Sequence, residues 1–133
     1  IGAELAAATG GAVTVFTLGP PSAEDVLREA IAWTEDRGVA VEGVLISDPA
    51  FAGSDTLATA RALAAALGRF DPFDLVLAGR NSVDADTGQV GPELAQLLDL
   101  AFVAGVRELA LAEQDIADRY FAGATSAPGV VTT

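Results

Sequence analysis

The residues best suited to ligand chemistry gather in one long polar loop that covers residues 78–92. Thr87, Gly88 and Gln89 stand at the predicted entrance of a helix, where unpaired backbone N–H groups and the positive end of the helix dipole favour an anion. Gly88 and Gly91 let backbone approach a ligand closely, and the threonine adds a hydroxyl donor. Loops longer than about 12 residues are often functional. The pattern therefore predicts a site for the phosphate of a nucleotide.

Two carboxylates, Asp84 and Asp86, belong to the same loop and have several interpretations. They could contact ribose hydroxyls, bind a cation or cap the following helix. A general acid must stay protonated near neutral pH, whereas a helix entrance and the nearby Arg80 favour the charged form. We therefore expect no catalytic role for either aspartate. The enzymatic alternative is a hydrolase in which both carboxylates and a substrate phosphate hold magnesium.

The inventory of side chains narrows the chemistry further. The 133-residue chain has no Cys and no His, and all 7 of its Lys and Arg positions are Arg. It lacks a thiol nucleophile, an imidazole base, a Schiff-base amine, a Walker-type lysine and a Cys/His zinc site. We expect no catalytic residue and no metal site.

The charge balance bears on possible partners, because 19 acidic residues against 7 basic ones give a net charge of -12. Nucleic acids and anionic membrane surfaces both attract dense Lys and Arg, so neither is an expected partner. No apolar run approaches the roughly 18 residues that are needed to insert across a membrane. A hydrophobic fraction of 51% indicates a folded domain.

Strands and helices are expected in alternation along the chain. Apolar and β-branched runs bounded by Gly or Pro predict strands over residues 12–18, 39–46 and 75–78. Helices are expected over residues 1–8, 23–34, 56–67 after an Asp55 cap, and 91–98. This alternation predicts an α/β fold, in which a parallel sheet carries helices on its faces.

Several local features accompany these helices. Ser22, three residues before Asp25, resembles a capping box. The helix over 23–34 places Val26, Ala30 and Trp33 on one face, and the helix after Asp55 has an apolar stripe of Leu57, Ala60, Leu63, Ala64 and Leu67. Beyond residue 98 the pattern weakens: strands are expected within residues 102–111 and 130–133, a helical turn or loop at 115–120, and a connection at 122–129.

Ligands of an open parallel sheet bind outside the carboxyl ends of its strands. One such end is Leu18-Gly19-Pro20. Its backbone could form a flat wall against an adenine, or it could make an ordinary turn into the next helix. The other informative strand end is the loop over residues 78–92.

Three stretches resemble the beta subunit of electron-transfer flavoproteins: residues 14–23, residues 47–60, and residues 79–95 with the run Asp86-Thr87-Gly88-Gln89-Val90-Gly91-Pro92. The resemblance covers about residues 1–112. It implies a three-layer Rossmann-like sheet, like that of the adenine nucleotide alpha-hydrolases, in a single nucleotide-binding domain over residues 1–133. It also implies that the first strand and the C-terminal recognition loop of the family lie outside this chain.

The same resemblance implies a cytoplasmic, non-catalytic electron carrier subunit. It would bind a structural AMP and form a heterodimer with an alpha subunit, which holds most of the FAD, to relay electrons from flavin dehydrogenases. Leu18 would offer backbone to the adenine, and the nucleotide would be bordered by Gly79, Arg80, Asn81, Asp84 and Asp86. Its phosphate would be held by Thr87, Gly88, Gln89 and Val90. For Arg80, a surface ion pair is the alternative to a place near the phosphate.

Other functions remain open at the level of sequence. A generic adenine-nucleotide-binding module of the universal-stress kind would share the fold and a phosphate loop but would have no redox role. An adenine-nucleotide hydrolase is also related by fold. A pure interaction domain would bind no nucleotide at all.

Overall fold

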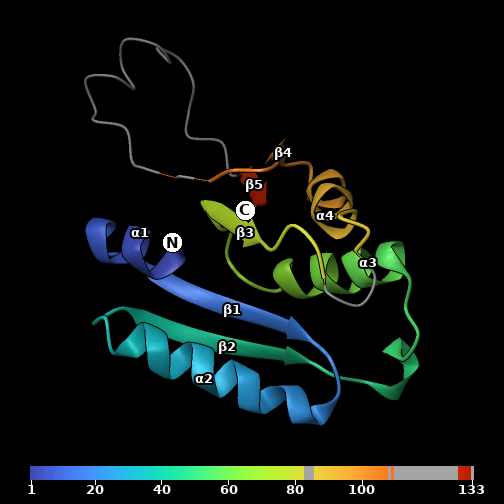
Figure 1. Ribbon diagram of the computed structural model, residues 1–133, viewed down its shortest axis with the longest axis horizontal. Helices are drawn as coiled ribbons and strands as arrows, with labels where there is room; N and C mark the ends of the chain where they lie inside the picture. The colour runs from blue at the N-terminus through green and yellow to red at the C-terminus, as the bar shows by residue number, and fades with distance from the viewer. Residues whose placement is uncertain (83–85, 108, 110–128, 133) are drawn as a thin grey trace. The chain divides into compact units, whose positions relative to one another are not determined.

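The computed structural model describes residues 1–82, 86–107, 109 and 129–132. The chain divides into two compact units, Ile1–Arg69 and Phe70–Thr133, and each is described here by itself. Both units combine parallel strands with helices (Figure 1).

The first unit is built on two parallel strands, β1 (Ala12–Leu18) and β2 (Ala40–Ile46). They pair residue for residue along their whole length, and their β-branched side chains suit the pleated backbone. Helix α2 (Glu24–Glu35) runs along one side of the pair, and α1 (Gly2–Thr9) and α3 (Thr56–Leu67) contact it from the other side (Figure 1). Short 3-10 turns precede α2 and α3, at η1 (Pro21–Ala23) and η2 (Pro49–Phe51).

The ends of α1 and α3 follow from their flanking residues. Helix α1 ends at Gly10, whose φ of +69° is the left-handed conformation that glycine adopts without a steric penalty. Helix α3 begins after Asp55, whose carboxylate accepts a hydrogen bond from the N–H of Ala58 at 2.8 Å. The predicted Asp55 cap is therefore confirmed.

The start of α2 differs from the expectation. Its N-cap is Ala23, which forms no side-chain cap hydrogen bond, and Ser22 lies inside the preceding 3-10 turn. The predicted capping box is wrong because Pro20 and Pro21 start a tight turn, and the hydroxyl of Ser22 is then one residue too early to cap the helix.

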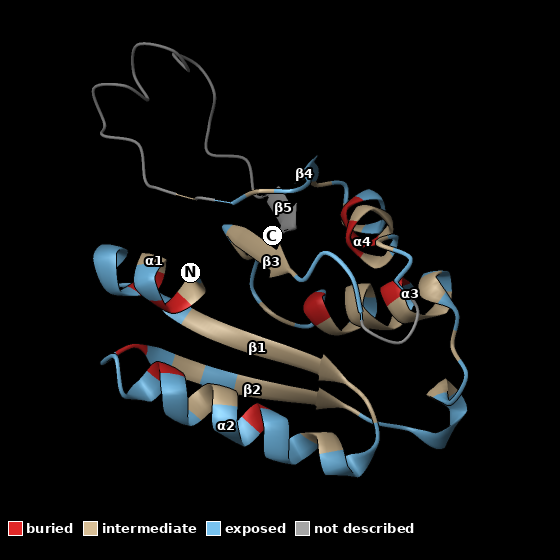
Figure 2. Ribbon diagram, in the orientation of Figure 1, coloured by how far each residue is buried: buried red, intermediate tan, exposed pale blue. Residues whose placement is uncertain are grey.

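The core side of α2 is set by a close approach to β2. A Cβ added at Gly43 would come within 2.6 Å of Ile31 Cδ1 and 3.0 Å of Leu27 Cγ. Leu27 is 5% exposed, so this is the packed face of the helix. The predicted shared face of Val26, Ala30 and Trp33 lies beside it, where Val26 is 64% and Trp33 48% exposed. Figure 2 shows this mixture of buried and exposed positions along α2.

The apolar stripe of α3 is mostly as predicted. Ala60 and Leu67 are buried, and Leu63 and Ala64 are half-buried. Leu57 is the exception, because it is exposed at the first turn of the helix.

The second unit contains three parallel strands in the order β3 (Leu75–Ala78), β5 (Gly129–Thr132) and β4 (Ala101–Val103). Helix α4 (Val90–Leu98) contacts β4 and β5. Leu94 and Ala95 are the hydrophobic residues of this helix that are buried. The polar loop that follows β3 ends where this helix begins, at Val90.

The predicted α/β fold with parallel strands and alternating helices is confirmed, and the chain is Rossmann-like. The strand expected within residues 102–111 is shorter, since β4 ends at Val103 and residues 104–107 are not in a strand. The predictions for 115–120 and for most of 122–129 fall outside the described residues. Among the helices that the structure describes, none has the length and apolar character to cross a membrane.

Candidate functional site

The predicted site residues lie in both units of the chain. Leu18 is the last residue of β1, in the first unit, where the next residue, Gly19, donates its N–H to the main-chain oxygen of Ile46 at 3.1 Å. The other predicted residues follow β3 in the second unit, from Gly79 to Val90. Asp84 is one of residues 83–85, which lie outside the described residues.

Hydrogen bonds close the loop after β3 on itself. The N–H of Asp86 donates to the main-chain oxygen of Ser82 at 3.0 Å. Asn81 Nδ2 donates to the main-chain oxygen of Asp86 at 3.1 Å and to its Oδ1 at 2.5 Å. These hydrogen bonds join the residues on either side of 83–85, and they bring Asn81 and Asp86 into direct contact.

Two residues of the loop adopt left-handed backbone conformations. Asp86 has a φ of +46° and Gly88 a φ of +62°. A Cβ added at Gly88 would lie 3.5 Å from the main-chain oxygen of Arg80 and 3.5 Å from Asn81 Oδ1, which is ordinary contact. Glycine thus adopts the left-handed conformation at 88 without steric cost, and an added Cβ there would make only ordinary contacts with the loop itself.

The first turn of helix α4 contains backbone hydrogen-bond donors without a partner in the described part of the chain. Its N-cap is Gln89, which forms no side-chain cap hydrogen bond. Pro92 has no N–H, and within the part of the chain that the structure describes, the N–H groups of Val90 and Gly91 have no acceptor. Asp86 therefore does not cap α4, and its side chain contacts Asn81 instead. Two first-turn donors remain available to an anion.

The loop before these donors is polar and largely exposed. Arg80, Asp86 and Thr87 are exposed and Gly88 and Val90 are half-buried, whereas Gly91 is buried. Over residues 1–82, 86–107, 109 and 129–132, Arg80 forms no ion pair, so the alternative of a surface ion pair is not realised there. In the same residues, no group of three or more acidic side chains could hold a metal ion.

The arrangement is suited to binding an anion. Backbone N–H groups, the Thr87 hydroxyl and the Arg80 guanidinium have the chemistry to donate to a phosphate, and the dipole of α4 has its positive end at the loop. The residues predicted to hold the phosphate stop at Val90, although Gly91 was expected to let backbone approach a ligand and its position in the first helical turn gives it a free N–H. Asn81 and Asp86 were predicted as separate ligand contacts, because no pattern marks a hydrogen bond between two loop side chains.

Comparison with known proteins identifies relatives over most of the chain. The family described as "Electron transfer flavoprotein domain" matches residues 1–129. An electron transfer flavoprotein subunit beta of Thermoanaerobacterium thermosaccharolyticum is 48% identical over 100 residues, which cover 75% of this chain and 36% of the relative. Protein FixA of Bradyrhizobium diazoefficiens is 45% identical over 114 residues, which cover 80% of this chain and 38% of the relative.

A third relative has a name that refers to an assembly. The subunit CarD of the caffeyl-CoA reductase-Etf complex of Acetobacterium woodii is 43% identical over 105 residues, which cover 79% of this chain and 38% of the relative. The chain thus spans less than two fifths of the length of each of these three relatives.

Proposed function

Because the chain belongs to the electron transfer flavoprotein family and is of the beta-subunit type, we propose that it binds AMP as a structural nucleotide. It forms a heterodimer with an alpha subunit, and the pair holds FAD mainly through that subunit to relay electrons from flavin dehydrogenases. Residues 1–133 contribute one nucleotide-binding domain to this assembly. The universal-stress alternative is not favoured, since the family match extends over residues 1–129.

The observation that carries the AMP proposal is the start of α4. The N–H groups of Val90 and Gly91 have no acceptor among the described residues, and the exposed Thr87 lies two residues before the N-cap of the helix. A phosphate there gains charge-assisted hydrogen bonds and a favourable interaction with the helix dipole. Adenosine has no group that could make these contacts.

The carboxylate of Asp86 is compatible with a nearby phosphate because it is already engaged. Its Oδ1 accepts a hydrogen bond from Asn81 Nδ2 at 2.5 Å, which directs part of its negative charge at an amide donor. Arg80 supplies a positive charge in the same loop. The residues present therefore fit a mononucleotide phosphate better than a bare cation, for which the described residues offer no cluster of three acidic ligands.

FAD, when bound, supplies the redox chemistry through its isoalloxazine ring. The residues of this chain would orient and shield the nucleotide and the flavin pocket, and none would carry electrons itself. The relative CarD is a subunit of a caffeyl-CoA reductase-Etf complex, which supports the expectation that this chain acts within a larger complex.

The test compares AMP, ADP and adenosine as stabilisers of the purified protein. Binding to the native state alone raises the melting temperature, and at a concentration of 100 times the Kd the gain is about 2.7 kcal/mol. We expect AMP and ADP to raise the melting temperature clearly more than adenosine, because adenosine lacks a phosphate. Equal stabilisation by AMP and adenosine would overturn the assignment of the phosphate to this loop.

We further propose that the chain performs no chemical step of its own. The sequence contains no His and no Cys, and its basic residues are all Arg, so it has no side chain that normally titrates near neutral pH. Incubation with ATP, ADP or AMP, with and without Mg²⁺, should give no turnover by chromatography. Sustained hydrolysis that is lost on substitution Asp84→Asn or Asp86→Asn would contradict this.

A further inference from the structure

Helix α2 carries an apolar stripe that the strands do not cover. Val26, Ala30 and Trp33 are four and three residues apart, so they share one face of the helix, which we call the α2 stripe. The strands are instead contacted through Leu27 and Ile31. Val26 is 64% exposed and Trp33 48%. A tryptophan and a valine left accessible on one face are typical of an interaction surface, in which aromatic residues are enriched.

The tryptophan of the α2 stripe is fixed in place before any partner arrives. The guanidinium carbon of Arg37 lies 3.2 Å from the centre of the Trp33 ring, in a cation–π contact. Arg37 Nη1 also donates a hydrogen bond to the main-chain oxygen of Trp33 at 2.6 Å. An indole held in this way loses little conformational entropy on binding, which favours its use as an anchor.

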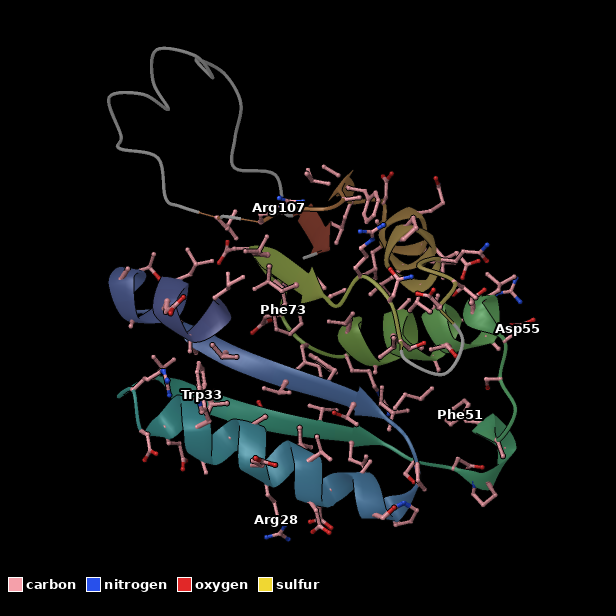
Figure 3. All side chains as sticks on the ribbon, in the orientation of Figure 1. Arg28, Trp33, Phe51, Asp55, Phe73 and Arg107 are labelled. Atoms are coloured by element: carbon pink, nitrogen blue, oxygen red, sulfur yellow. The ribbon has the colours of Figure 1, made fainter. Side chains whose placement is uncertain are left out.

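A row of carboxylates runs beside the α2 stripe. Asp25 and Glu29 share the neighbouring face of the helix, the C-cap residue Asp36 continues this face by its spacing, and all three are exposed. In the described part of the chain, none of the three forms an ion pair. On the other side of α2, by contrast, Arg28 Nη2 lies 2.6 Å from Glu24 Oε1. In Figure 3 the labelled side chains of Trp33 and Arg28 leave α2 in different directions.

The charges decide what kind of partner fits this surface. A second copy of the chain would bring another net charge of -12 and its own acidic row to the contact, so self-association is opposed by repulsion. A straight ridge of apolar side chains with charges along one flank is complementary to an amphipathic helix. We propose that the α2 stripe binds a basic amphipathic helix of a partner protein. The apolar side chains of that helix would pack on Val26 and Trp33, and its Lys or Arg side chains would lie opposite Asp25, Glu29 and Asp36.

The experiment uses the only tryptophan of the chain as its reporter, so emission changes can be assigned to Trp33. The probe is a synthetic 14-residue helical peptide with Leu on one face and Lys on the other, and the control peptide has Glu in place of every Lys. The Lys peptide should shift the emission of Trp33 to shorter wavelength in a saturable way, because the indole becomes covered. The Glu peptide should leave the emission unchanged.

Two matched charge variants test whether the acidic row is specific. The substitutions Glu29→Gln and Asp36→Asn together should lower the affinity for the Lys peptide about tenfold or more. Glu24→Gln and Glu35→Gln remove the same charge from the other side of α2 and should leave the affinity within about twofold. Val26→Ser should lower the affinity for the Lys peptide, and an unchanged circular dichroism spectrum would show that the fold is intact.

Several outcomes would overturn the proposal. One is an emission of Trp33 that stays unchanged when the Lys peptide is added. Another is an equal loss of peptide affinity in the two charge variants, which would indicate only a general attraction to an acidic protein. A dimer in sedimentation equilibrium, with an emission shift that depends on protein concentration alone, would show that the surface binds a second copy instead. Strong protection of Trp33 from acrylamide in the protein alone would show that another part of the polypeptide already covers it.

Discussion

Asn81 Nδ2 donates a hydrogen bond to the main-chain oxygen of Asp86, five residues further along the chain, at 3.1 Å. A second bond from the same nitrogen reaches Asp86 Oδ1 at 2.5 Å. The amide thereby fixes Asp86 in its left-handed conformation, and Gly88 and the first turn of α4 follow directly. Asn81 is thus a positioning residue for the donors that we assign to the phosphate.

Asn81→Ala should lower the affinity for AMP more than it lowers the stability of the fold. The loss of two exposed hydrogen bonds costs about 1 kcal/mol of stability, because water replaces the partner. AMP affinity should fall about tenfold, since the donors of the loop are no longer held together. Asn81→Asp should be worse than Asn81→Ala, because it places a second carboxylate against Asp86. Calorimetric titration with AMP checks this order, which would be contradicted if Asn81→Asp bound as well as the unsubstituted protein.

Gly88→Ala should separate backbone strain from ligand binding. An L-residue in a left-handed conformation costs roughly 1–2 kcal/mol, and the φ of Gly88 is +62°. Gly10→Ala is the matched control, since Gly10 has a φ of +69° and no atom within 4 Å of an added Cβ. Urea unfolding should show similar losses of stability in the two variants. Only Gly88→Ala should also lose stabilisation by AMP; a similar loss in Gly10→Ala would argue against a local effect.

Asp55→Ala and Ser22→Ala test the two helix starts that the sequence treated alike. Removal of a side-chain cap costs about 1 kcal/mol, and Asp55 accepts a hydrogen bond from the Ala58 N–H at 2.8 Å. Ser22 lies in a 3-10 turn and caps nothing in α2. Denaturation should therefore show a loss of about 1 kcal/mol for Asp55→Ala and less than about half of that for Ser22→Ala. Equal losses would contradict the position of the α2 N-cap.

Gly43→Ala tests the closest packing in the first unit. The added Cβ would meet Ile31 Cδ1 at 2.6 Å and Leu27 Cγ at 3.0 Å, so α2 or its side chains must move. Overpacking of this kind costs about 1–3 kcal/mol. The midpoint of urea unfolding should fall accordingly. A variant as stable as the unsubstituted protein would show that α2 is not held against β2 at this position.

The sequence was most informative where a single strong pattern had no competitor. β1 and β3 have the predicted bounds, since β-branched or aliphatic runs between turn residues fit only a strand. On α2, two overlapping apolar patterns compete, one through Val26 and Trp33 and one through Leu27 and Ile31. Spacing alone could not decide which of the two patterns faces the strands. The choice depends on how closely α2 packs against Gly43 of β2, which is a tertiary contact.

The sequence predicted the helix that follows the polar loop, but it did not predict the hydrogen bonds inside the loop. Helix-entrance residues and loop length pointed to residues 87–90, and the structure places α4 from Val90. The contact between Asn81 and Asp86 depends on a positive φ at an aspartate, for which no residue pattern is diagnostic. Leu18 belongs to the other unit, so its role toward the adenine rests on the family resemblance.

The central claim, that a nucleotide phosphate binds at the first turn of α4, is tested most directly by NMR of backbone amides. In ¹H–¹⁵N spectra of the protein, AMP should shift the amide signals of Gly88, Val90 and Gly91 most strongly, because the proposal puts the phosphate at or next to their N–H groups at the start of α4. Adenosine at the same occupancy should leave these signals nearly unchanged. The account would be contradicted if AMP and adenosine shifted these amides equally, or if AMP left them unshifted while it perturbed residues elsewhere.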